Sequence, residues 1–101
     1  MYIVIVKNKV KQSKKSEYMR HSRLFAEEVK RVAGCKNTYV LASVDYEDIV
    51  VNVEIWESKN AYEQYDGHVF LKYKEKLKPD FIRIQQKFIC FKKEDMLGIS
   101  F

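Results

Sequence analysis

The alternation of apolar and polar positions predicts four strands. Residues 2–6 form an unbroken apolar run of mostly β-branched side chains, which is typical of a strand buried on both faces. Residues 38–46 and 49–56 are rich in strand-forming residues and are separated by a short acidic break, so we expect them to pair as a hairpin. A last apolar strand is predicted at residues 88–91.

Other segments carry the spacing of amphipathic helices. Between residues 14 and 33, apolar positions recur at helical spacing, charged side chains cover the other side, and Gly34 is placed to end the helix. Ser58 suits the N-cap of a short second helix. Asp66-Gly67 interrupts that helix, and a further helical stretch is expected to end at Pro79.

The predicted order is strand, helix, strand, strand, helix, strand. This is the α+β, ferredoxin-like βαββαβ arrangement, with a four-stranded antiparallel sheet and helices on one face. In that topology the first and third strands are central, and they are the two whose sequences indicate burial on both faces. Such a sheet leaves its other face uncovered, and if that face is apolar a second subunit can cover it, so we expect a homodimer packed through the sheet face.

The strand at residues 49–56 carries chemically distinctive side chains. Alternation places Asn52, Glu54 and Trp56 on one face. A buried amide at Asn52 has to satisfy its hydrogen bonds with the backbone or with a ligand, and a buried carboxylate at Glu54 needs a partner. Trp56 can be core packing or a pocket wall. His68 titrates near neutrality and can act as base or proton relay, or it can cap a helix in solvent.

Length and charge limit the function classes. The chain has 101 residues, so we expect one domain over residues 1–101, with a core at about 2–93 and an apolar tail at 94–101. Aromatic residues make up 14% of the chain, enough to line a pocket or an interface. The net charge of +5 comes from scattered lysines, which favours a solvated surface over a nucleic-acid partner.

Cysteine and histidine usage predicts no metal site. Cys35 and Cys90 are far apart, and neither histidine has an acidic residue at ligand spacing. His21 lies among arginines, and we expect it to be exposed. A lysine-rich chain with two lone cysteines and no secretion signal suggests the cytoplasm. No apolar run is long enough to cross a membrane.

The segment after the third strand resembles a known family. The run Glu54-Ile-Trp56-Glu-Ser58, the pair Ala61-Tyr62 and the run His68-Val-Phe70 are similar to the antibiotic-biosynthesis monooxygenase (ABM) superfamily of dimeric α/β barrels. The turn Ala33-Gly34-Cys35 also resembles the small-residue break of that family. The resemblance covers roughly residues 2–93 and implies a homodimer with one small pocket in each subunit.

One branch of the family oxidises aromatic polyketides to quinones with oxygen, and it uses neither metal nor flavin. Its pocket has an Asn and a Trp four residues apart on a strand and a Tyr on the next helix, and Asn52, Trp56 and Tyr62 resemble that set. The His and Arg that accompany them in that branch are replaced here by Ala42 and Lys76, near the equivalent places.

This resemblance implies a cofactor-independent monooxygenase acting with oxygen on a small aromatic or hydroxylated substrate. The residues expected to be catalytic are Asn52, Trp56 and His68. Those expected to bind substrate are Tyr62, Tyr65, Glu54 and Phe70.

Two other functions are compatible with the same fold. A haem-degrading branch has an Asn at the end of the first strand, which Asn8 matches, but Lys74 or Glu75 lies near the place of its iron-ligating His. Haem would be the cofactor in that case. The third possibility is a non-enzymatic small-ligand-binding or stress-response dimer.

Overall fold

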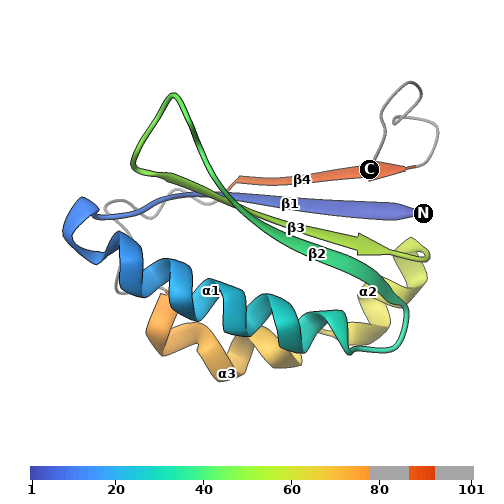
Figure 1. Ribbon diagram of the computed structural model, residues 1–101. Helices are drawn as coiled ribbons and strands as arrows, with labels where there is room; N and C mark the ends of the chain where they lie inside the picture. Colours follow the sequence, from blue (N-terminus) through green and yellow to red (C-terminus); the bar gives the residue numbers. More distant parts are fainter. Residues whose placement is uncertain (78–86, 93–101) are drawn as a thin grey trace.

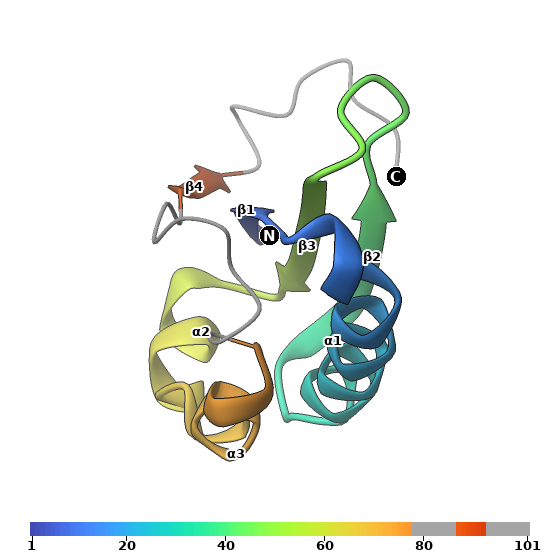
Figure 2. The same cartoon turned by 90° about the vertical axis from the view of Figure 1, so that its left-hand side faces the viewer.

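The computed structural model describes residues 1–77 and the backbone of residues 87–92. The elements are β1 (Tyr2–Lys9), the short 3-10 turn η1 (Gln12–Lys14), α1 (Lys15–Lys30), β2 (Cys35–Ala42), β3 (Ile49–Trp56), α2 (Lys59–Tyr65), α3 (His68–Leu77) and β4 (Lys87–Lys92). The strands form one sheet in the order β2-β3-β1-β4, and every neighbouring pair is antiparallel. The three α-helices lie on one side of this sheet (Figures 1 and 2). The ferredoxin-like α+β fold is therefore confirmed.

Register decides which side chains of the two central strands meet beneath the helices. Tyr2 pairs with Trp56, Val4 with Glu54, and Val6 with Asn52. Because side chains alternate along a strand, these residues all project from the same face of the sheet. The predicted shared face of Asn52, Glu54 and Trp56 is confirmed, and it is the face that the helices cover.

The main core lies between this face and the helices. α1 contributes Tyr18, Phe25 and Val29, whose spacing places them on the side of the helix that meets the sheet. Trp56 from β3 is entirely buried in the same cluster. A second apolar cluster, on the other face of the sheet, consists of Ile3, Val53 and Ile55, with Ile5 and Val51 packed against it.

The α1–β2 turn lies unusually close to α2. Gly34 has a φ of +89°, a conformation that side-chain-bearing residues rarely adopt. A Cβ atom at this position would lie 2.7 Å from the Cβ of Ala61 in α2. The carbonyl of Gly34 also accepts a hydrogen bond from the backbone N–H of Glu57 (2.8 Å), so the turn is fixed to the end of β3 as well.

Several boundaries differ from the sequence predictions. β1 extends to Lys9 rather than ending at Val6, because its pairing with β3 continues to Ile49. β2 begins at Cys35, opposite Trp56, and ends at Ala42, so Val44 lies in the following loop and is almost fully exposed. Pro79 and residues 94–101 lie outside the described residues.

The expected exposure of His21 is wrong: only 7% of it is accessible. It lies three residues after Tyr18 and four before Phe25, so it belongs to the inner face of α1 despite its charged neighbours. In the described part of the chain, no helix combines the length and apolar character needed to span a membrane.

Candidate functional site

A cavity of about 210 Å³ lies between the helix-covered face of the sheet and the helices. Its apolar lining consists of Val4, Val6, Phe25, Phe70 and Leu77, together with Gly67. Three tyrosines border it, namely Tyr18, Tyr62 and Tyr65. Its remaining lining residues are Asn8, Asn52 and Glu54. The cavity is thus mostly apolar and aromatic, with a few polar groups that can orient a ligand.

Asn8 and Asn52 place two carboxamides in this cavity. They lie diagonally across β1 and β3, because Asn52 pairs with Val6 and Asn8 pairs with Val50. Both residues are buried, and neither Oδ1 atom has a hydrogen-bond donor among the described residues. Leaving a buried polar atom unpaired costs about 1–3 kcal/mol. Turning either amide over would leave an NH₂ group in the same position, so both side chains are suited to meet a polar ligand.

Glu54 is the one acidic residue among the described residues that line the cavity. Its Oε1 accepts a hydrogen bond from the indole N–H of Trp56 (3.0 Å). Burial raises the pKa of the Glu54 carboxyl, because a desolvated carboxylate loses its hydration, while the bond from Trp56 acts in the opposite direction. A carboxyl of this kind exchanges a proton more readily near neutral pH than an ordinary surface carboxyl does.

Trp56 lies behind the cavity wall. Its ring stacks on Tyr65, with centroids 5.1 Å apart and planes 26° apart, and meets Tyr62 edge-on at 5.8 Å. It does not contribute to the cavity lining. Its contact with the cavity is therefore indirect, through Glu54 and the two tyrosines that border it.

The Tyr65 hydroxyl and the Cys35 thiol are poor proton acceptors. Burial and the nearby charge of Glu54 raise the pKa of Tyr65, so its hydroxyl stays protonated. The same two causes, burial first, raise the pKa of Cys35 to about 11. The Cys35 thiol donates to the carbonyl of Asn37 at 3.6 Å. Neither group is poised to act as nucleophile or base at neutral pH.

His68 lies outside the cavity lining and is exposed. Its Nδ1 is 2.7 Å from the carbonyl oxygen of Tyr65, which it can contact only as a donor. The chain reverses between these two residues, because Asp66 has a φ of 61° and Gly67 a φ of 71°. The turn orients the imidazole toward the end of α2 rather than toward Asn52.

The structure brings together five of the seven residues expected at the site. Asn52, Glu54, Tyr62, Tyr65 and Phe70 line one cavity, whereas Trp56 and His68 do not.

Sequence reasoning did not assign the second carboxamide to this site. The sequence resemblance connects Asn8 only with the haem-degrading branch. The sequence does contain a signal for it: Asn8 continues the alternation of Val4 and Val6, which places its amide on the same face of the strand.

The described residues that line the cavity offer haem no histidine ligand. Neither histidine is among the described lining residues: His21 is on α1, and the exposed His68 reaches the ring of Tyr65, with centroids 5.0 Å apart. A cavity of about 210 Å³ is also much smaller than a tetrapyrrole requires. Among the residues that the structure describes, no three His, Cys, Asp or Glu side chains form a cluster able to hold a metal ion.

Comparison with solved structures shows the same fold in several bacteria and an archaeon. A conserved protein of Methanosarcina mazei Go1 superposes with a TM-score of 0.81 at 22% identity, covering 91% of each chain. A candidate antibiotic biosynthesis monooxygenase of Nitrosomonas europaea superposes with a TM-score of 0.80 at 19% identity, covering 91% of this chain and 97% of that one. A similar candidate from Caulobacter crescentus CB15 superposes with a TM-score of 0.80 at 20% identity, covering 89% of this chain and 86% of that one.

A search of curated proteins found no match. The family described as antibiotic biosynthesis monooxygenase matches residues 1–76, which include β1 to β3 and every residue of the cavity except Leu77. The chain therefore belongs to the antibiotic biosynthesis monooxygenase family.

Proposed function

We propose that this protein is a monooxygenase that oxidises a small phenolic substrate with molecular oxygen, without metal or flavin. Family membership supports the reaction class. The observation that carries the proposal is the pair of unsatisfied carboxamides, Asn8 and Asn52, in an aromatic-lined cavity. Such a cavity suits a flat ring that carries at least one hydroxyl group.

The proposed reaction needs no external reductant. A phenol and one O₂ give a quinone and one water: one oxygen atom becomes the new carbonyl, and the other leaves with two hydrogens. The substrate supplies all four electrons that reduce O₂. The protein has to hold the ring, exclude water and stabilise the phenolate that reacts with oxygen.

The lining residues can perform these tasks. A carboxamide accepts from a hydroxyl through its oxygen and donates to a phenolate through its NH₂ group. Asn8 and Asn52 can therefore bind the substrate oxygen in either protonation state. Tyr62, Tyr65 and Phe70 provide aromatic surfaces against which a substrate ring can pack edge-on or offset.

The cavity size favours a single substituted ring. An enclosed cavity of about 150 Å³ accommodates benzene, and sites for drug-sized ligands start at about 300 Å³. The cavity here, about 210 Å³, falls between these values. We therefore propose a one-ring phenol as the substrate class.

Oxygen consumption tests the proposal directly. Purified protein treated with a chelator should consume one O₂ per phenol and form the corresponding quinone, whereas the matched methyl ethers should be inert. With ¹⁸O₂, the quinone should gain one labelled atom. Asn52→Leu should abolish the reaction.

Phenol binding without oxygen consumption across the panel would refute the oxygenase and favour a non-enzymatic ligand-binding protein. A shifted Soret band on titration with haemin would instead support the haem alternative.

We also propose that two copies associate through the sheet face that the helices leave uncovered. Tyr39 and Leu41 on the edge strand β2 share this face with Val51 and Val53, as their register shows. Of the two β2 side chains, Tyr39 is 36% exposed and Leu41 is 51% exposed. Exposed apolar side chains beside an apolar cluster are suited to an isologous interface between identical subunits.

A further inference from the structure

The geometry points to Glu54 as the catalytic base of this cavity and to Trp56 as the residue that positions it. This inference rests on the proposed oxidation of phenols, because the base is the group that forms the reactive phenolate. His68 was the expected proton acceptor, but its exposed ring and its contact with the Tyr65 carbonyl leave it outside the cavity.

Glu54 is placed to act on a hydroxyl that Asn52 holds. The two residues are separated by one position on β3 and project from the same face, which sets them about 7 Å apart along the strand. Both line the cavity. A hydroxyl oxygen bound between them can lie within hydrogen-bonding distance of both side chains.

Trp56 restricts how the Glu54 carboxylate can turn. The indole N–H holds Oε1 at 3.0 Å, which leaves Oε2 as the oxygen available to the substrate. The indole is itself fixed by its stacking on Tyr65 and by complete burial. Trp56 does not line the cavity, so its effect on the proton transfer passes through Glu54, which makes it a positioning residue.

Other titratable groups also lie near the cavity. They are Tyr18 from α1, Tyr62 and Tyr65 from α2, and Cys35 from β2. The pKa values of Tyr65 and Cys35 are raised, so both remain protonated. No lysine or arginine is among the described residues that line the cavity. Among the described residues that line the cavity, Glu54 is the one carboxyl group.

The proton transfer moves a negative charge from Glu54 to the substrate oxygen. The substrate O–H bond breaks, its electron pair stays on the phenolic oxygen, and the proton moves to Oε2 of Glu54. The raised pKa of Glu54 brings it closer to the pKa of a phenol, about 10. This makes the transfer less unfavourable than it would be to a carboxylate in water. The phenolate then adds O₂ at a ring carbon to form a peroxide anion, which takes the proton back from Glu54 and restores the charge of the carboxyl. The O–O bond breaks as the hydrogen on that ring carbon leaves, which gives the quinone and one water.

The first experiment follows deprotonation in the absence of oxygen. The probe is 4-nitrophenol, whose anion absorbs at longer wavelength than the neutral form. At a pH where free 4-nitrophenol is neutral, wild-type protein should bind it with the spectrum of the anion. Glu54→Gln, which can still accept the Trp56 N–H, should bind it with the neutral spectrum. His68→Ala should behave as wild type.

The second experiment separates positioning from packing. Trp56→Phe removes the N–H bond that favours the charged form of Glu54, so the acidic limb of kcat/KM should move to higher pH. Glu54→Gln should eliminate this limb and lower kcat at least 100-fold, in the range expected for loss of a general base. Thermal unfolding of each variant checks that it is folded.

The outcomes distinguish this inference from the proposed function. An identical anion spectrum for wild type and Glu54→Gln, or an unmoved acidic limb in Trp56→Phe, would overturn the role of Glu54 and Trp56. A Glu54-dependent anion spectrum with no oxygen consumption would support Glu54 as proton acceptor and refute the oxygenase.

Discussion

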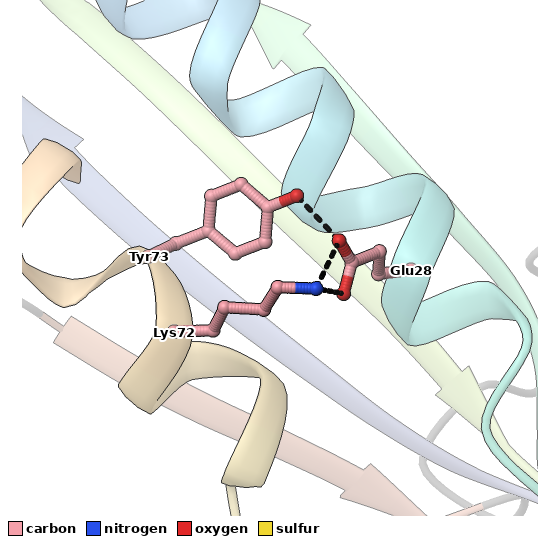
Figure 3. A network of polar contacts seen from close by, with 3 residues as sticks. All are labelled: Glu28, Lys72 and Tyr73. Atoms are coloured by element: carbon pink, nitrogen blue, oxygen red, sulfur yellow. Dashed lines mark hydrogen bonds and ion pairs between the residues drawn. The ribbon is translucent and has the colours of Figure 1, made fainter.

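The hydroxyl of Tyr73 donates a 2.6 Å hydrogen bond to Oε1 of Glu28 and thereby joins α3 to α1 (Figure 3). Nζ of Lys72 lies 3.0 Å from both oxygens of the same carboxylate. The Tyr73 bond, followed by the contact with Lys72, lowers the pKa of Glu28. The same bond raises the pKa of Tyr73. This network holds the two long helices together beside the cavity.

The Glu28 network should make stability depend on pH. Because the pKa of Glu28 is lower in the folded state, its contribution is present above the unfolded value of 4.5 and is lost as pH falls through the folded value. We expect Glu28→Gln to lower Tm at neutral pH, and this difference to shrink at pH values well below 4.5. Thermal melts followed by circular dichroism measure both effects. Glu27→Gln, an exposed neighbour, is the control and should leave Tm unchanged at every pH.

Asn52→Leu should stabilise the protein while removing its function. The substitution replaces a buried amide, whose oxygen is unpaired among the described residues, with an apolar side chain of similar size. Relief of that penalty should raise the free energy of unfolding by about 1 kcal/mol. Urea unfolding measures the gain, and a phenol titration measures the loss of binding. Lower stability in the variant would show that the amide is satisfied in the folded protein.

Gly34→Ala and Gly67→Ala form a matched pair. Both glycines have positive φ, so each substitution should cost about 1–2 kcal/mol in backbone strain. Only Gly34 has a close neighbour, because nothing lies within 4 Å of a Cβ built at Gly67. We therefore expect Gly34→Ala to lose clearly more stability in urea unfolding. Equal losses would mean that α2 moves away from the turn without resistance.

Leu41→Glu should disrupt the proposed dimer. It places a charge on the uncovered sheet face, where desolvating it would oppose association. Multi-angle light scattering should show a dimer for wild type and a monomer for the variant. Leu71→Glu is the control, since Leu71 is 68% exposed on α3, in the helical layer. Dissociation by Leu71→Glu alone would locate the interface on the helices instead.

The sequence pattern was sufficient to predict the fold, because the fold depends on the periodicity of apolar positions. An unbroken apolar run identified β1, large apolar side chains on both faces identified β3, and alternation along β3 correctly grouped Asn52 with Glu54. Periodicity specifies the face of the strand from which a side chain projects, but not the direction in which that side chain then turns. It could not show that Trp56 turns toward Tyr65, which depends on how α2 packs.

The errors at the site have similar physical origins. The arginines beside His21 indicate an exposed position, whereas its spacing from Tyr18 places it on the inner face of α1. Asn8 joins Asn52 only through the strand register, which no local pattern specifies. His68 is close to the site in sequence, but the left-handed turn at Asp66 and Gly67 directs it elsewhere.

The contact between Gly34 and Ala61 sets the distance between α2 and the sheet. Two of the smallest residues meet there, so the helix cannot approach further, and the Ser58 cap holds its start in place through the Ala61 N–H. α2 carries Tyr62 and Tyr65, which form one side of the cavity. The turn at Gly34 thus determines how far α2 lies from the sheet, and therefore how wide the cavity is. A relative with a bulkier residue in place of Ala61 would have a wider cavity between α2 and the sheet and would accept bulkier substrates.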